Sequence, residues 1–140
     1  MAFKSTKSPA VATADPEALY RLLAKTNNGP AHLWGHQTEL LRSWHENFKE
    51  QDNVALELPT GAGKTLVGGL IAEWLRREER KPVAYLCPTR QLAKQAHEKL
   101  ESYGVQAVDL TGPFKRWAPA ARMRFTNAQA VAVSTYGHVF

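Results

Sequence analysis

The feature that most constrains the fold of this chain is a glycine-bearing run between an apolar segment and a helical pattern. The apolar segment covers residues 54–58, and the run that follows it covers residues 59–65. Apolar side chains then recur at the spacing of one helix face, at Leu66, Leu70, Ile71 and Trp74. The sequence therefore predicts a strand at 54–58, a tight turn, and a helix that begins near residue 64.

The composition of this turn indicates a phosphate-binding loop. Gly61 and Gly63 lack a Cβ atom, so the backbone can approach an anion and point successive N–H groups at it. The helix N-terminus adds a positive dipole end. Lys64 is expected to reach the β and γ phosphates of a nucleotide, and the Thr65 hydroxyl to occupy one position on Mg²⁺. The expected nucleotide contacts are Pro59, Thr60, Gly61, Ala62, Gly63, Lys64 and Thr65. The alternative is a glycine-rich turn with an exposed lysine.

Two blocks in this order resemble motifs of a known family. The general phosphate-loop pattern has its first glycine where this chain has Leu58. The variant at residues 59–65 resembles motif I of superfamily 2 helicases and translocases, the DEAD/DEAH-box-like group, and residues 84–95 resemble their motif Ia. The resemblance covers about residues 15–140. It implies an α/β fold, an incomplete RecA-like P-loop NTPase with a parallel sheet flanked by helices, and ATP, Mg²⁺ and DNA or RNA as ligands.

The motif Ia block also predicts a phosphate contact from its own residues. Thr89 follows Pro88 and is expected to be the N-cap of a helix. Arg90 then lies in the first turn, where the helix dipole disfavours a cation unless an external anion is present. A nucleic-acid phosphate meets that need, and a solvated or acid-paired Arg90 is the alternative. The expected buried stripe of this helix is Leu92, Ala96, Leu100 and Tyr103.

Charge is distributed unevenly along the chain. Lysine and arginine total 18 against 13 acidic residues, and no acidic residue follows Asp109. Basic and aromatic side chains alternate in this last part of the sequence, at Phe114, Lys115, Arg116, Trp117, Arg122 and Arg124. Such a segment can hold phosphates, here through Lys115 and Arg116, and can stack bases. The alternative is an ordinary solvated segment with Trp117 in the core.

Two further residues are site candidates through the family resemblance. Gln37 lies upstream of motif I, where superfamily 2 proteins commonly carry a glutamine that recognises the adenine edge. Trp34 beside it is a candidate to stack on the base, with hydrophobic packing as the alternative. The full DEAD-box Q motif is missing, and a surface glutamine at a helix start is the alternative. Thr135 ends an apolar segment that resembles motifs Ib and Ic, in which the threonine contacts the nucleic-acid backbone; a strand-end cap is the alternative.

The remaining pattern predicts three regions. Residues 1–14 have the composition of a disordered lead-in. Residues 15–50 are expected to form N-terminal helices, the first capped by Asp15 with Leu19, Leu22 and Leu23 on one face, the second over 35–50. Residues 51–140 are expected to form the partial RecA-like ATP-binding domain. Its further strands are predicted at 83–87, 105–110 and 130–134, with a basic connection between the last two.

The sequence lacks a recognisable partner for hydrolysis. No pair of acidic residues follows an apolar strand, and Asp109 is the only candidate carboxylate. We therefore expect the N-terminal portion of a larger helicase-like ATPase, inactive alone, whose downstream domain is a partner. A non-motor P-loop protein and a silent binding module are the alternatives. The lone Cys87, expected to be inert core, and the lack of a signal peptide or membrane span predict a cytoplasmic protein, or a nuclear one in a eukaryote.

Overall fold

A small parallel sheet forms the middle of the molecule. The computed structural model describes residues 15–26, 30–59, 61 and 63–138, so the predicted disordered lead-in lies outside the described residues. The sheet has the order β1-β3-β2, formed by β1 (Ala84–Cys87), β3 (Val131–Thr135) and β2 (Ala107–Asp109). Both outer strands run parallel to β3, which is buried along its whole length. The α/β parallel architecture expected of an incomplete RecA-like domain is thereby confirmed.

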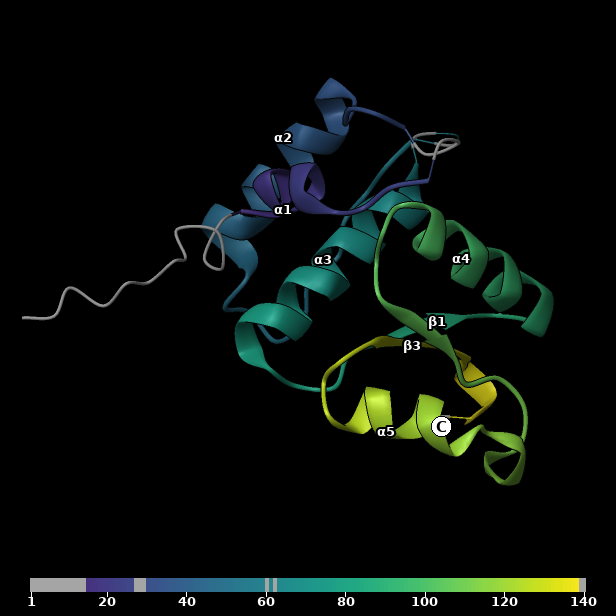
Figure 1. Cartoon of the computed structure of the whole chain (residues 1–140). Helices are drawn as coiled ribbons and strands as arrows, with labels where there is room; N and C mark the ends of the chain where they lie inside the picture. Colours follow the sequence, from purple (N-terminus) through teal and green to yellow (C-terminus); the bar gives the residue numbers. More distant parts are fainter. Residues whose placement is uncertain (1–14, 27–29, 60, 62, 139–140) are drawn as a thin grey trace, which may run out of the picture.

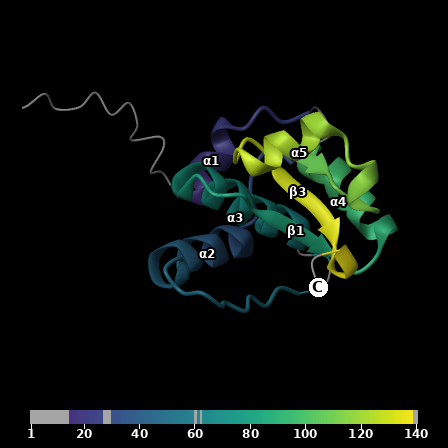
Figure 2. The same ribbon diagram turned by 90° about the horizontal axis from the view of Figure 1, so that it is seen from below.

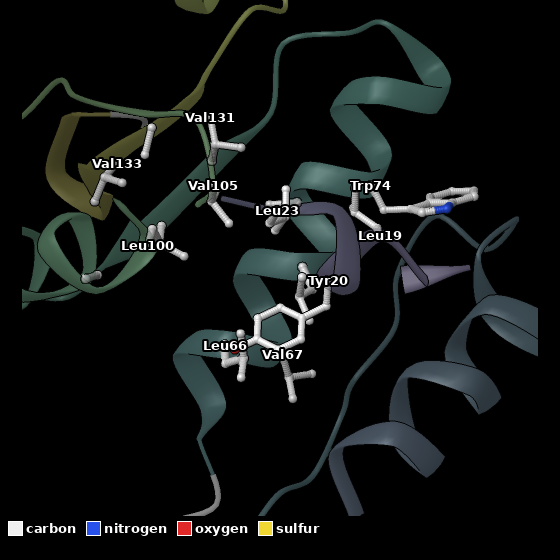
Figure 3. Packing of buried hydrophobic residues seen from close by; sticks show 14 of the residues in the cluster. Leu19, Tyr20, Leu23, Leu66, Val67, Trp74, Leu100, Val105, Val131 and Val133 are labelled. Atoms are coloured by element: carbon white, nitrogen blue, oxygen red, sulfur yellow. The ribbon is translucent and has the colours of Figure 1, made fainter. Parts of the chain in front are cut away.

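Helices cover both faces of this sheet (Figure 1). On one face lie α3 (Lys64–Glu79) and α4 (Arg90–Ser102), and on the other lies α5 (Pro119–Thr126), which Figure 2 shows beside β3. The larger core fills the space on the α3 and α4 side, where Leu100, Val131 and Val133 pack together (Figure 3). A smaller core joins the opposite face of the sheet to α5. The result is a three-layer arrangement in which β3 is central.

The N-terminal helices pack against α3. The first, α1 (Pro16–Leu22), begins where the Asp15 carboxylate accepts a hydrogen bond from the Ala18 N–H at 2.8 Å, as its N-cap role predicts. Leu19 and Leu23 are buried near α3 (Figure 3). The prediction for Leu22 is wrong, because its side chain is 54% exposed. Tyr20, one position from the predicted stripe, is buried in its place.

The predicted second helix is present in two parts. These are α2 (Gly35–Ser43) and a π-helical turn, η1 (Trp44–Phe48). Leu41 and Trp44 are buried, and Leu40 and Phe48 pack partly buried against the larger core. The Trp44 ring meets that of Trp74 edge to face, with centroids 5.5 Å apart, an arrangement that aromatic pairs favour. This contact joins η1 to the far half of α3.

The strand predicted at residues 54–58 does not form. Residues 53–59 have no regular structure, although Leu56 and Leu58 pack partly buried against the larger core. A strand needs a neighbour to receive its backbone hydrogen bonds, and the described strands pair only in the order β1-β3-β2. An apolar composition was therefore sufficient for packing but not for a sheet ladder. The other predicted strands are confirmed, with ends shifted by one or two residues.

Helix α4 begins at the predicted residue, but its buried face differs slightly from the predicted one. The Thr89 hydroxyl accepts a hydrogen bond from the Leu92 N–H at 3.2 Å, which confirms the N-cap. Ala93, Ala96 and Leu100 are buried, whereas Leu92 is 45% exposed and Tyr103 is half-buried. The predicted stripe is therefore wrong at Leu92, because the buried face is centred one residue further along.

The basic connection contains structure that the sequence pattern did not predict. It holds a 3-10 turn, η2 (Phe114–Arg116), and the eight-residue α5. Helix α5 has little separation between apolar and polar faces, but Pro119 at its first turn is a helix-start signal. A last 3-10 turn, η3 (Tyr136–His138), follows β3. No described helix combines the length and apolar composition of a membrane span.

Candidate nucleotide and nucleic-acid sites

The described part of the glycine-bearing loop has the backbone of an anion-binding turn. Gly61 has φ +78° and Gly63 has φ +73°, both in the left-handed region where an L side chain is strained. Gly63 is also the N-cap of α3, a 16-residue helix that starts at Lys64. The N–H groups of the first turn and the positive dipole end of this helix therefore meet at the loop. Thr60 and Ala62 lie outside the described residues, and Pro59 is exposed beside them.

A hollow of about 380 Å³ opens at this helix start. Its volume is within the range of small-molecule sites. Lys64 is exposed there, so its ammonium group is available to a ligand. The described lining residues come from three stretches of the chain and are Pro30, Trp34, Gln37, Gly61, Gly63, Lys64, Thr65, Leu66, Lys99 and Tyr103.

Gln37 lies against the glycine-bearing loop. Its side chain is only 4% exposed, and its Oε1 accepts a hydrogen bond from the Trp34 N–H at 2.9 Å. A Cβ atom added to Gly63 would stand 2.2 Å from Gln37 Nε2. Gln37 is thus a buried contact of the loop and not the surface glutamine of the alternative interpretation. Trp34, 56% exposed, lies at the rim of the same hollow.

Thr65 lies beside a residue that the sequence did not single out, Tyr85 of β1, and both line one hollow. Burial raises the pKa of the Tyr85 phenol, although the nearby Thr65 side chain acts to lower it. The Tyr85 ring lies over Gly68, where an added Cβ would stand 2.9 Å from the ring. Gly68, one turn beyond Thr65, therefore leaves room for the ring. A glycine inside a helical pattern was the only sequence signal of this contact.

The groups at this site suit a nucleotide that binds together with Mg²⁺. The loop offers N–H groups and Lys64 to phosphates, and Thr65 offers a hydroxyl oxygen, a ligand type that Mg²⁺ accepts. Among the described residues there is no cluster of three or more histidine, cysteine, aspartate or glutamate side chains suited to a metal. The site therefore fits triphosphate binding with Thr65 as the protein ligand to Mg²⁺.

A second group of candidates lies at the carboxyl ends of the strands. Thr89 and Arg90 follow β1, and Gly112 follows β2, so the parallel sheet brings them to one edge. The Arg90 Nη2 atom is 3.9 Å from the position that a Cβ on Gly112 would occupy. The motif Ia arginine is thus a neighbour of the segment that carries Lys115 and Arg116, both exposed on η2.

Trp117 anchors that segment. Its Nε1–H donates to the Gly112 carbonyl at 3.1 Å, and the half-buried ring packs on the smaller core. Phe114, 59% exposed, lies with its ring centroid 5.1 Å from that of Trp117. The structure therefore agrees with the packed interpretation of Trp117 and leaves Phe114 as the exposed aromatic side chain.

Two other candidates are engaged in contacts within the protein, Thr135 in the buried sheet and Asp109 in an exposed turn. Thr135 is 6% exposed and pairs in register with Cys87, which is also buried, as expected for an inert thiol. We therefore do not include Thr135 in the nucleic-acid surface. The Asp109 carboxylate accepts hydrogen bonds from the Thr111 N–H at 2.9 Å and the Thr111 hydroxyl at 2.7 Å. Those bonds hold Asp109 in a local turn.

A buried ion pair on α3 was missed because a lone glutamate in a helix usually indicates a solvated face. Glu73 is fully buried and binds Arg76, while Arg77 donates to it at 2.7 Å. Its other oxygen accepts from the Gln106 N–H at 3.1 Å, and Arg76 donates to the Ala128 carbonyl at 2.9 Å. These bonds compensate the buried charge and fix α3 to the loops that enter β2 and β3.

Comparison with known proteins identifies the family. Residues 31–140 match the family described as "Type III restriction enzyme, res subunit". Reverse gyrase 2 of Aeropyrum pernix is 34% identical over 71 residues, which are 51% of this chain and 6% of that protein. The chain thus matches only a small part of this relative. It belongs to the type III restriction enzyme res subunit family, a helicase-like group of superfamily 2, and carries part of the RecA-like domain of that superfamily.

Proposed function

We propose that this chain is the ATP-binding part of a nucleic-acid helicase or translocase, in which ATP hydrolysis by the whole protein drives movement on DNA or RNA. The observation that supports this most is the joint position of the Gly61–Gly63 turn, Lys64 and Gln37 around one hollow. Selection of ATP requires a site for the phosphates and an adjacent site for the adenine base. Family membership supports the helicase-type activity.

Each residue has a separate task in the proposed site. The N–H groups at the start of α3 bind phosphate oxygens, and Lys64 neutralises charge on the β and γ phosphates. Gln37, which has both a donor and an acceptor, recognises the adenine edge. Mg²⁺, when bound with the nucleotide, supplies further charge neutralisation, and the Thr65 hydroxyl is its protein ligand.

The nucleic-acid strand binds at the edge formed by Thr89, Arg90, Lys115 and Arg116. Arg90 lies in the first turn of α4, where a phosphate satisfies both the guanidinium and the helix N-terminus. The two η2 side chains are exposed beside it. These contacts position the strand without reading its sequence, because phosphates are identical at every nucleotide.

Titration calorimetry with Mg-ATP tests the nucleotide site. Lys64→Ala should weaken binding by about 10- to 100-fold, because a charge-assisted hydrogen bond is worth roughly 1.5–3 kcal/mol. Lys81→Ala is the matched control, because Lys81 is 74% exposed, lies outside the hollow and forms a 3.7 Å ion pair with Glu79. Equal affinity in the wild-type chain and a folded Lys64→Ala variant would exclude the proposed site.

A further inference from the structure

We propose that Phe114 is a stacking surface for an unpaired base, and that the strand bound beside it is therefore single-stranded. The inference rests on the proposed function, because it names the form of nucleic acid bound at the same edge. It assigns the stacking role to Phe114 and not to Trp117, the other aromatic residue of the segment.

The Phe114 ring is presented by a firmly held turn. Its ring is 59% exposed, although the turn is closed by hydrogen bonds from the Arg116 N–H to the Pro113 carbonyl at 2.8 Å and from the Trp117 N–H to the Phe114 carbonyl at 3.1 Å. Trp117 supports the ring from the protein side, with the two ring planes tilted by 53°. An aromatic ring fixed in this way loses little conformational freedom when a base stacks on it.

One cation lies over the exposed ring, and others lie on the same segment. The Arg122 guanidinium carbon lies 4.8 Å from the Phe114 ring centroid, within the range of a cation–π contact. Lys115 and Arg116 are exposed on the same turn, and Arg90 approaches Gly112, whose carbonyl holds Trp117. No acidic residue follows Asp109 in the sequence to oppose this charge.

This combination favours a nucleic acid over an apolar protein partner. A single exposed phenylalanine needs no explanation, but one with an arginine over its ring and two exposed cations on the same turn matches the pattern of stacking platforms beside a backbone-binding groove. Stacking on a side chain requires a base that is free of its neighbours. Bases within a duplex are stacked on each other, so an unpaired strand is the expected ligand.

The test compares two fluorescent oligonucleotides of equal length and phosphate number, one an oligothymidylate and the other lacking bases. By anisotropy, Phe114→Ala should weaken oligothymidylate binding by roughly 5- to 150-fold, which corresponds to about 1–3 kcal/mol for one stacked base, and leave binding of the abasic strand unchanged. Lys115→Ala with Arg116→Ala should weaken both strands equally. Leu22→Ala, which removes a side chain that is 54% exposed on α1, is the control and should change neither.

The outcomes separate the inference from the function on which it rests. If the wild-type chain binds both strands and Phe114→Ala lowers neither affinity, the stacking role is wrong while nucleic-acid binding stands. If the wild-type chain binds neither strand, the proposed nucleic-acid surface itself is wrong. A third measurement uses a duplex of the same length. If the duplex binds more tightly than the single strand and Phe114→Ala lowers both affinities by the same factor, the inference is also wrong.

Discussion

Thr65, proposed to bind Mg²⁺, and Tyr85 of β1 line the same hollow between α3 and the sheet. Tyr85 lies close over Gly68, so the ring fits between the sheet and the second turn of α3. This packing places the first turn of the nucleotide helix beside the strand whose end carries Thr89 and Arg90. The two candidate sites are therefore joined by one short path through β1.

Alkaline pH should destabilise the fold. Burial raises the pKa of the phenols of Tyr20, Tyr85 and Tyr103 above the ordinary value of 10.0. Burial also raises the pKa of the Cys87 thiol above its ordinary value of 9.0. The unfolded chain loses these protons first, so the folded state holds more of them at high pH. The free energy of unfolding should be fully retained below pH 9 and fall as pH rises through the raised folded values. Urea unfolding across pH measures it.

Tyr85→Phe provides the internal check on that pH dependence. The variant removes one raised pKa, so its stability should decline less steeply above pH 10 than that of the wild-type chain. Below pH 9 neither free energy of unfolding should depend on the ionisation of this tyrosine, so the two proteins should differ only by a constant offset. Stability that rises with pH in this range would contradict the assignment of these groups as buried acids.

Gln37→Ala should lower affinity for ATP more than for GTP. The lost contacts are to the adenine edge, whereas the phosphate contacts remain. The loss of the acceptor for the Trp34 N–H should also destabilise α2 by about 1 kcal/mol, typical of a lost cap. Competition against a fluorescent nucleotide measures the ratio of the ATP and GTP affinities, and thermal unfolding measures the loss of stability. Gln91→Ala, at an exposed glutamine on α4, is the control; an equal loss for both nucleotides would make Gln37 a purely structural residue.

Gly63→Ala should damage both the fold and nucleotide binding. A left-handed φ of +73° costs an alanine about 1–2 kcal/mol, and its Cβ would also collide with Gln37 Nε2. Gly35→Ala is the matched control, because nothing lies within 4 Å of its Cβ position and its φ is ordinary for an L residue. That control should leave the melting temperature unchanged or raise it. A Gly63→Ala variant as stable as the wild type would show that the turn is not constrained.

The isolated chain should show no multiple-turnover ATPase activity. Asp109, the only carboxylate that the sequence offered, is held by Thr111, and Thr65 alone does not orient a water for attack. A phosphate-release assay with excess Mg-ATP measures this. Turnover that disappears in Lys64→Ala would contradict the expectation, and loss of that turnover in Asp109→Asn would identify the missing acid.

Local features were predictable from the sequence. Asp15 and Thr89 were correctly predicted as N-caps because a cap depends only on residues within one turn. Leu22 and Leu92 were predicted on the buried face, but the adjacent residues Leu23 and Ala93 are the buried ones. Both members of each pair are compatible with the helical spacing of apolar residues. Tertiary packing decides between such neighbours.

Features that depend on distant partners were not predictable. The segment at 54–58 has the composition of a strand, but a strand exists only where another strand accepts its hydrogen bonds. Glu73 is buried because Arg76 and the Gln106 N–H converge on it, and their approach follows from the packing of α3. The contacts of Gln37 with the loop and of Arg90 with Gly112 have the same origin.

Because the three described strands run parallel, the residues that follow their carboxyl ends lie at one edge of the sheet. The turn between α3 and β1 precedes a strand and therefore lies at the opposite edge. Lys81 is 74% exposed in that turn, and the chain's single native thiol, Cys87, is buried. A cysteine introduced at Lys81 would therefore accept a dye selectively. Such a dye would give an optical reporter remote from the residues proposed to touch nucleotide or nucleic acid.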